Sequence, residues 1–328
     1  MKAKVYILIL LSGCIMLHAC QKNIDIFVPD PGQPNGPDTS WHSTVTASMP
    51  VTSLKNNLLQ DVYTDTITVD ASTTNITTPA GVRLTFPPHC CVNASGQLVT
   101  GKVDVEVQLV KKKGDMIRQN RPSTYNDSLL TTAGEIFIRL QKEGQALQLA
   151  PNARISIRYV DLPVNPLVKF FIGDESNTDR FNWLPTPTPS ADTIIIGTQA
   201  YEILTRRLRW INIGALYDAG NSMAKVAVAA DMETHFTNAN TIAFTVFKDM
   251  YAVAGMHADV SSRKFISSKL PVGKEITVVV ISKMENDYYL GHTAAVTQTP
   301  SATPLTQHVQ VAPVKKSLAE ILSYLSSL

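Results

Sequence analysis

Apolar and polar side chains alternate with a period of two along most of this 328-residue chain. The alternation is clearest, in full or in part, at residues 103–109, 136–140, 155–159, 225–228, 242–246 and 276–280. Successive side chains of a β-strand point to opposite faces of a sheet, so a period of two indicates strands with one buried and one wet face. No long segment before residue 314 has helical spacing. Many short strands separated by Gly, Asn, Asp and Pro turns predict an all-β chain of antiparallel β-sandwiches.

The chain is long and apolar enough for two ordinary cores, because 44% of its residues are hydrophobic and only 17% are charged. Three alternating prolines, Pro185, Pro187 and Pro189, interrupt strand patterns on both sides and suggest a boundary, although a long loop inside one domain fits them equally. The predicted division is a signal peptide at 1–19, a lipidated Cys and stalk at 20–45, a first sandwich at 46–165, a connecting region at 166–198, a second sandwich at 199–312, and a C-terminal helix at 313–328.

The C-terminal segment differs from the rest of the chain. Ser317 can cap a helix, and Glu320 follows at the spacing of a capping box. One apolar stripe follows the helical period at Leu318, Ile321, Leu322, Leu325 and Leu328. A helix of about 12 residues is marginal alone, so we expect it to dock onto its own domain; docking onto a partner, or fraying, are the alternatives.

The N-terminus has the order of a secretory signal: basic Lys2 and Lys4, then an apolar run from Val5 to Met16 that is too short to span a bilayer. The sequence Leu17-His18-Ala19-Cys20 that follows resembles the lipobox of bacterial lipoproteins. The resemblance implies cleavage before Cys20 and acylation of its thiol and amine. The alternative is a buried N-terminal strand or helix in which Cys20 is incidental.

The residues after Cys20 bear on where the protein resides. Gln21 stands where many lipoproteins held in an inner membrane have Asp, which favours delivery to the outer membrane. The stretch from Pro29 to Asp38 is too rich in Pro and Gly for regular structure and would act as a stalk. We therefore expect a cell outer-membrane protein, attached through its lipid anchor and facing the periplasm or the cell surface.

A second resemblance covers mainly residues 78 to 160. The segments that carry it are Gly81 to Pro88, Asn93 to Gly96, Gly101 to Val105, and Leu129 to Glu135 with the strand after it. Together they look like a ZU5-like β-sandwich, an arrangement that many uncharacterised Gram-negative lipoproteins also have. The resemblance implies a sandwich used for protein contacts, sometimes followed by a second sandwich, and it implies no enzyme activity.

Charge and motifs exclude several function classes. The chain has 29 Lys and Arg against 27 Asp and Glu, and loss of Lys2 and Lys4 with the signal peptide makes the two equal. This balance argues against nucleic acid or a polybasic membrane surface as a partner. Gly96 to Lys102 fits the start of a phosphate-binding loop, but Val103 replaces the hydroxyl residue and a strand follows in place of a helix. We predict no cofactor and no catalytic residue.

After signal cleavage and lipidation, Cys90 and Cys91 are the remaining cysteines. Neighbouring side chains of a strand point to opposite faces, so the expectation is one buried and one half-exposed thiol, with a strained vicinal disulfide as the alternative. His89 is adjacent, but three consecutive residues cannot easily converge on one tetrahedral ion. We predict no metal site.

Aromatic residues supply the candidate ligand contacts, because an exposed ring can stack on a sugar. Trp183, beside the proline run, is the better binding candidate, although core packing is favoured for it too. Trp210 alternates with its neighbours Arg209 and Ile211 and is predicted to lie in the core. Tyr288 and Tyr289 must face opposite ways on a strand, so one of them is expected to be exposed.

Two functions follow from these observations. The first is a non-catalytic lipoprotein that binds a protein or a glycan outside the cytoplasm. The alternative is a self-processing sandwich, because His235-Phe236-Thr237 resembles the cleavage tripeptides of some ZU5-like and related domains. There the hydroxyl attacks the preceding carbonyl in a strained turn and the His assists proton transfer. An ordinary strand start explains the same tripeptide without any chemistry.

Overall fold

The computed structural model describes residues 38–126, 128–176, 180–187, 189, 191–217, 224–299 and 306–328. The predicted signal peptide, Cys20 and nearly all of the predicted stalk lie outside these residues. The chain divides into two units, Met1–Asp38 and Thr39–Leu328, and every element below belongs to the second. Among the described residues, no helix is both long and apolar enough to cross a membrane.

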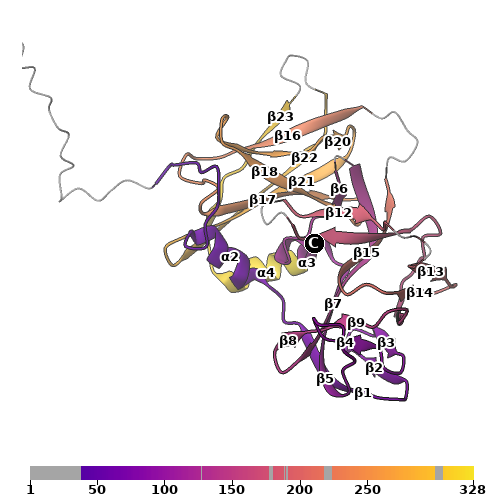
Figure 1. The fold of residues 1–328 in the computed structure, drawn as a ribbon. Helices are drawn as coiled ribbons and strands as arrows, with labels where there is room; N and C mark the ends of the chain where they lie inside the picture. Colours follow the sequence, from indigo (N-terminus) through magenta and orange to yellow (C-terminus); the bar gives the residue numbers. More distant parts are fainter. Residues whose placement is uncertain are drawn as a thin grey trace, which may run out of the picture. The chain divides into compact units, whose positions relative to one another are not determined.

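The first part of the second unit is a β-sandwich of two larger sheets (Figure 1). One sheet has the order β1-β5-β7-β15-β11-β12, with β6 and β8 paired to β7. Its strands are β1 (Tyr63–Val69), β5 (Gly101–Val110), β6 (Thr124–Tyr125), β7 (Ser128–Lys142), β8 (Gln145–Ala146), β11 (Lys169–Asp174), β12 (Asn182–Pro185) and β15 (Arg209–Leu216).

The other sheet has the order β13-β14-β10-β3-β2, and a separate pair is formed by β4 and β9. These strands are β2 (Thr74–Thr77), β3 (Arg83–Phe86), β4 (Cys91–Val92), β9 (Gln148–Leu149), β10 (Ile155–Val160), β13 (Thr193–Ile196) and β14 (Ala200–Thr205). The alternation predicted for residues 103–109 is confirmed, because Val103, Val105 and Val107 are buried while Asp104 is exposed. The buried valines pack with side chains of β3, β10 and β14 in one core between the two sheets.

The rest of the chain forms a single nine-stranded sheet with the order β20-β16-β19-β18-β17-β21-β22-β24, in which β23 pairs in parallel with β16. The strands are β16 (Lys225–Asp231), β17 (Thr241–Phe247), β18 (Val253–Asp259), β19 (Lys264–Ser267), β20 (Leu270–Pro271), β21 (Glu275–Met284), β22 (Asp287–Val296), β23 (Thr306–Gln310) and β24 (Val314–Lys316). The Thr293 hydroxyl donates to the Gln310 carbonyl over 2.9 Å, so the sheet curves until its two sides meet. Its concave face encloses an apolar core of its own.

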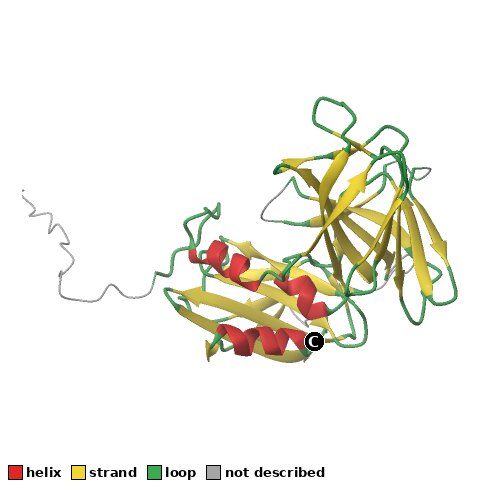
Figure 2. Cartoon of the chain, turned by 90° about the horizontal axis from the view of Figure 1, so that it is seen from below, coloured by secondary structure: helices red, strands yellow, loops and turns green. Residues whose placement is uncertain are grey.

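Three short helices cover the other face of this sheet: α2 (Pro50–Leu58), α3 (Lys113–Arg118) and α4 (Leu318–Ser326) (Figure 2). The predicted capping box of α4 is confirmed, since the Ser317 hydroxyl accepts from the Glu320 N–H and the Glu320 carboxylate accepts from the Ser317 N–H. Ile321 and Leu325 are fully buried, so α4 docks onto its own chain. A Cβ on Gly114 of α3 would lie 1.7 Å from the Leu325 carbonyl oxygen, so only glycine permits this approach.

The all-β prediction is confirmed, but the sheets divide the chain differently from the predicted domains. The strands β11, β12 and β13 fall in the predicted connecting region, yet they pair within the two sheets of the first sandwich. The strands β14 and β15, assigned to the second sandwich, do so as well. The proline run joins β12 of one sheet to β13 of the other. Prolines show where a strand ends, but they do not show whether the chain then leaves the domain.

Candidate functional site

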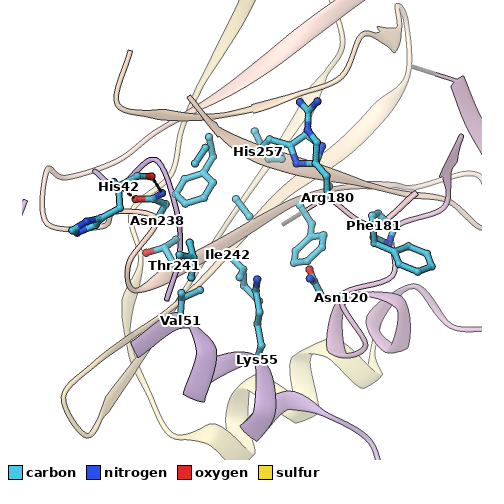
Figure 3. A pocket seen from close by; sticks show the side chains of 18 of the residues that line it. His42, Val51, Lys55, Asn120, Arg180, Phe181, Asn238, Thr241, Ile242 and His257 are labelled. Atoms are coloured by element: carbon cyan, nitrogen blue, oxygen red, sulfur yellow. Dashed lines mark hydrogen bonds between the residues drawn. The ribbon is translucent and has the colours of Figure 1, made fainter. Parts of the chain in front are cut away.

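A cavity of about 300 Å³ lies over β17 and β18 of the nine-stranded sheet (Figure 3). Its walls come from segments that are distant in the sequence: residues 42–45, helix α2, the turn after α3, and the residues before β12. Long-range packing of the sandwich, the nine-stranded sheet and the helices therefore creates the cavity, and no single motif does.

The floor of the cavity is apolar. Ile242 and Phe244 of β17 point to the helix-covered face of the sheet and are buried there. Gly255 of β18 pairs with Phe244, and a Cβ at this position would lie 3.3 Å from Pro122 Cγ. The glycine thus leaves room above the floor that a side chain would fill.

Basic and amide side chains line the rest of the cavity. Lys55 extends from α2 toward the sheet, and Arg180 lies beside His257 on the far wall (Figure 3). Burial and the nearby Arg180 guanidinium lower the pKa of His257 to about 4, so its imidazole is neutral at pH 7. Lys55 and Arg180 also take part in further interactions. Asn120 and Asn238 add amide groups, and none of the described residues that line the cavity is Asp or Glu.

The wall formed by residues 39–45, called here the strap, has its backbone fixed at His42 by the Asn238 side chain. The His42 N–H donates to Asn238 Oδ1 over 3.0 Å, and Asn238 Nδ2 donates to the His42 carbonyl over 2.6 Å. Asn238 is itself buried, in the turn between β16 and β17. The strap therefore has a fixed position over the sheet although it contains no regular secondary structure.

The structure places Trp183 in the core and not on the surface, so it corrects the predicted ligand contact. Its side chain is fully buried, its indole N–H donates to the Pro122 carbonyl over 3.0 Å, and the Phe181 ring meets it edge-on at 4.8 Å. Core packing, which the sequence favours for Trp183, is confirmed. The core prediction for Trp210 is confirmed, since it is 6% exposed and packs on Phe137.

Tyr288 and Tyr289 of β22 are both half-buried, and neither lines the cavity. The Tyr288 hydroxyl accepts from Asn57 Nδ2 over 2.7 Å, and its ring packs in the cluster beneath the helices. The Tyr289 ring instead meets Phe236 at 5.7 Å. The two rings therefore make separate packing contacts, and the expectation that one of them is exposed is wrong.

His235, Phe236 and Thr237 lie in the turn region between β16 and β17 and do not begin a strand. His235 Nδ1 lies 3.5 Å from the Glu233 carboxylate, and the His235 ring packs on Phe236 at 4.2 Å. The hydroxyl of Thr237, which is buried, accepts from the Ala239 N–H over 3.3 Å. No residue of the tripeptide has a positive φ. These contacts pair the imidazole with Glu233 and the Thr237 hydroxyl with the Ala239 N–H, in a turn whose tripeptide has no left-handed residue.

Cys90 and Cys91 are both buried, which corrects the expectation of one half-exposed thiol. His89 has a φ of 50°, so the chain turns at this point before the short strand β4 begins. The turn brings the two Sγ atoms to 3.4 Å as free thiols. This contact lowers the pKa of Cys90 and raises that of Cys91. In the described part of the chain, no group of three or more His, Cys, Asp or Glu side chains is placed to hold a metal ion.

Comparisons with protein-family models, with curated proteins and with solved structures found no match.

Proposed function

We propose that this chain is a non-catalytic binding module, tethered to the outer membrane through Cys20, that binds a small organic anion in the cavity over β17 and β18. The observation that carries the proposal is the composition of the cavity, whose described lining has Lys55 and Arg180 but no acidic residue. Ligand sites are concave and mostly apolar, with a few polar groups that orient the ligand.

The two kinds of surface in the cavity define the chemistry of the ligand. Ile242 and Phe244 offer contact to an apolar body such as an aromatic ring. Lys55 and Arg180 offer charged donors to a carboxylate or sulfonate, and such hydrogen bonds are stronger than neutral ones. The neutral His257 imidazole can donate or accept one hydrogen bond without adding charge.

The test is calorimetric titration of the chain with benzoate and naphthalene-2-sulfonate, beside the size-matched neutral benzamide and naphthalene-2-sulfonamide. We expect the acids to bind and the amides to bind at least about tenfold more weakly, as the loss of one charged hydrogen bond implies. Lys55→Gln and Arg180→Gln should weaken binding of the acids by a similar factor. The matched controls, Lys102→Gln and Arg158→Gln, change exposed residues of the first sandwich and should have no effect. Equal binding of acids and amides would overturn the proposed ligand class.

The anchor is tested separately. Acyl chains contribute about 0.8 kcal/mol per buried CH₂, so the wild-type protein should partition into membranes or the detergent phase. Cys20→Ser should release the protein or stall its processing. If the wild-type protein is soluble and its signal peptide is cut elsewhere, the proposed lipid anchor is wrong. The proposal that the cavity binds an organic anion would not be affected.

The self-processing alternative is tested by intact mass. We expect one chain that ends at Leu328. Two fragments that meet between Phe236 and Thr237, and that disappear in Thr237→Ala, would replace the binding proposal with the alternative.

A further inference from the structure

A second cavity, of about 330 Å³, borders the same strap. Trp41 of the strap lines it, and the Trp41 ring packs against Phe265 with 5.1 Å between ring centroids. Phe265 in turn lines the first cavity. The Trp41–Phe265 pair is therefore a partition, with one ring bordering each cavity.

Trp41 differs from the other two tryptophans in its exposure. Trp183 and Trp210 are buried in the cluster beneath the helices, whereas Trp41 is half-buried. Phe265 supports the Trp41 ring, so the ring keeps its orientation when the cavity is empty. A fixed, half-exposed indole offers an apolar face and one N–H donor, which suits a ligand with an apolar face and polar edges.

The polar lining of the second cavity contains charges of both signs. Asp231 and Glu233 supply carboxylates, and Arg263 and Lys264 supply cations. Asp231 accepts from Lys264 Nζ over 2.6 Å and lies 3.1 Å from His308 Nδ1. Burial alone would raise the pKa of Asp231, but its hydrogen bonds with Lys264 and His308 outweigh that effect and hold the pKa below its usual value. The Asp231 carboxylate is thus ionised at neutral pH and acts as an acceptor.

We propose that this second cavity binds a neutral saccharide, with a sugar ring face on Trp41 and the sugar hydroxyls between the carboxylates and the cations. Each hydroxyl can donate to Asp231 or Glu233 and accept from Arg263 or Lys264. An anionic ligand would face two carboxylates, and a cationic ligand would face Arg263 and Lys264. A neutral polyol can form hydrogen bonds to groups of either sign without repulsion. The cavity volume is at the small end for ligand sites, which fits one or two sugar units.

This proposal does not rest on the organic-anion proposal, because different residues carry it. Tryptophan emission provides the first readout, since the ligand would change the environment of Trp41 and leave the two buried tryptophans unchanged. The chain is titrated with maltose, cellobiose, mannobiose, lactose and chitobiose, and binding is measured in parallel by calorimetry. At least one of these sugars should give a saturable emission change that matches the calorimetric isotherm. If none of the five binds at millimolar concentration, the proposal is wrong.

Variants then locate the site. Trp41→Ala should weaken sugar binding about 2- to 10-fold, as loss of one aromatic contact implies. Because that change also removes packing on Phe265, Glu233→Gln serves as a second variant; the Glu233 side chain is 73% exposed, so folding should not depend on it. Glu233→Gln should weaken sugar binding while leaving benzoate binding unchanged. Tyr251→Ala removes an aromatic side chain that is 64% exposed elsewhere and is the control for nonspecific stacking. Equal sugar affinity in Trp41→Ala, Glu233→Gln and Tyr251→Ala would overturn the proposal.

Discussion

The two cavities share the strap and the Trp41–Phe265 partition, yet their charges differ. In the described lining, the first has two basic residues and no acid, whereas the second has two carboxylates and two cations. The first draws its cations from α2 and from the segment before β12, and the second draws its charges from the ends of β16 and β19 and their adjoining turns. The sheet provides similar room on both sides of the partition, and the attached segments decide which charges line each side.

The largest change in stability and in both binding affinities should come from removing the Phe265 ring of the partition. Phe265 is 4% exposed, so Phe265→Ala should lower the free energy of unfolding by about 3–5 kcal/mol. The two cavities should merge, and binding of both benzoate and sugar should weaken. Urea denaturation and the two titrations measure these effects.

Phe265→Leu is the control for volume, since it keeps an apolar side chain there and should lose less stability. If Phe265→Ala leaves both affinities unchanged, the partition does not shape either cavity.

The next largest effect should come from a change of pH, which should alter the charge of the first cavity but not that of Asp231 in the second. His257 has an unfolded pKa near 6.5 and a folded pKa of about 4, so the folded state binds fewer protons than the unfolded state between these values. The stability that depends on neutral His257 is complete above pH 6.5 and is lost as the pH falls to about 4. The total loss is up to about 3 kcal/mol. In the second cavity, the Asp231 carboxylate stays charged through this window because its pKa is lowered.

Denaturation of the wild type and of His257→Gln from pH 7 to pH 4 tests this effect. The wild type should lose stability relative to the variant as the pH falls. Parallel curves for the two proteins would show that His257 is not held neutral by the cavity.

The sequence predicted the strands and the C-terminal helix because those patterns are local. Alternation fixes which side chains of residues 103–109 face the core, and the Ser317–Glu320 capping box involves residues three apart. Cavity residues carry no such pattern. Lys55, Arg180 and His257 are separated by tens to hundreds of residues. They meet only because α2 and the segment before β12 both pack against the nine-stranded sheet.

The tryptophans show the same limit. Trp41 lies among polar residues in the predicted linker, whereas Trp183 follows Phe181 beside the proline run, so of these two the sequence singles out only Trp183 as a candidate contact. Trp183 is buried because its strand packs beneath the turn after α3, where the Pro122 carbonyl accepts its N–H. Trp41 precedes α2 and packs on Phe265 of β19. Which tryptophan has an open face is thus decided by contacts across more than 60 residues.

A moderate effect on both cavities should follow from releasing the strap. Asn238→Ala removes both hydrogen bonds to the His42 backbone and should lower stability by about 1–3 kcal/mol. Because the strap walls both cavities, affinity for benzoate and for sugar should fall together. Asn286→Ala, in the exposed turn between β21 and β22, is the matched control and should change neither. If only one affinity falls in Asn238→Ala, the strap is not a common wall.

The smallest effect should come from Gly255→Ala, and it should be confined to the first cavity. The new Cβ would lie 3.3 Å from Pro122 Cγ and 3.8 Å from His257 Cε1, so the proline ring must move slightly. That crowding is opposed by the lower entropy of the unfolded chain when Ala replaces Gly, so stability should change by no more than about 1 kcal/mol. The methyl group occupies space beside Phe244 on the floor of the cavity, so affinity for naphthalene-2-sulfonate should fall more than affinity for the smaller benzoate. Sugar affinity should not change, because Gly255 does not line the second cavity. A fall in sugar affinity equal to the fall in sulfonate affinity would show that the two cavities act as one site.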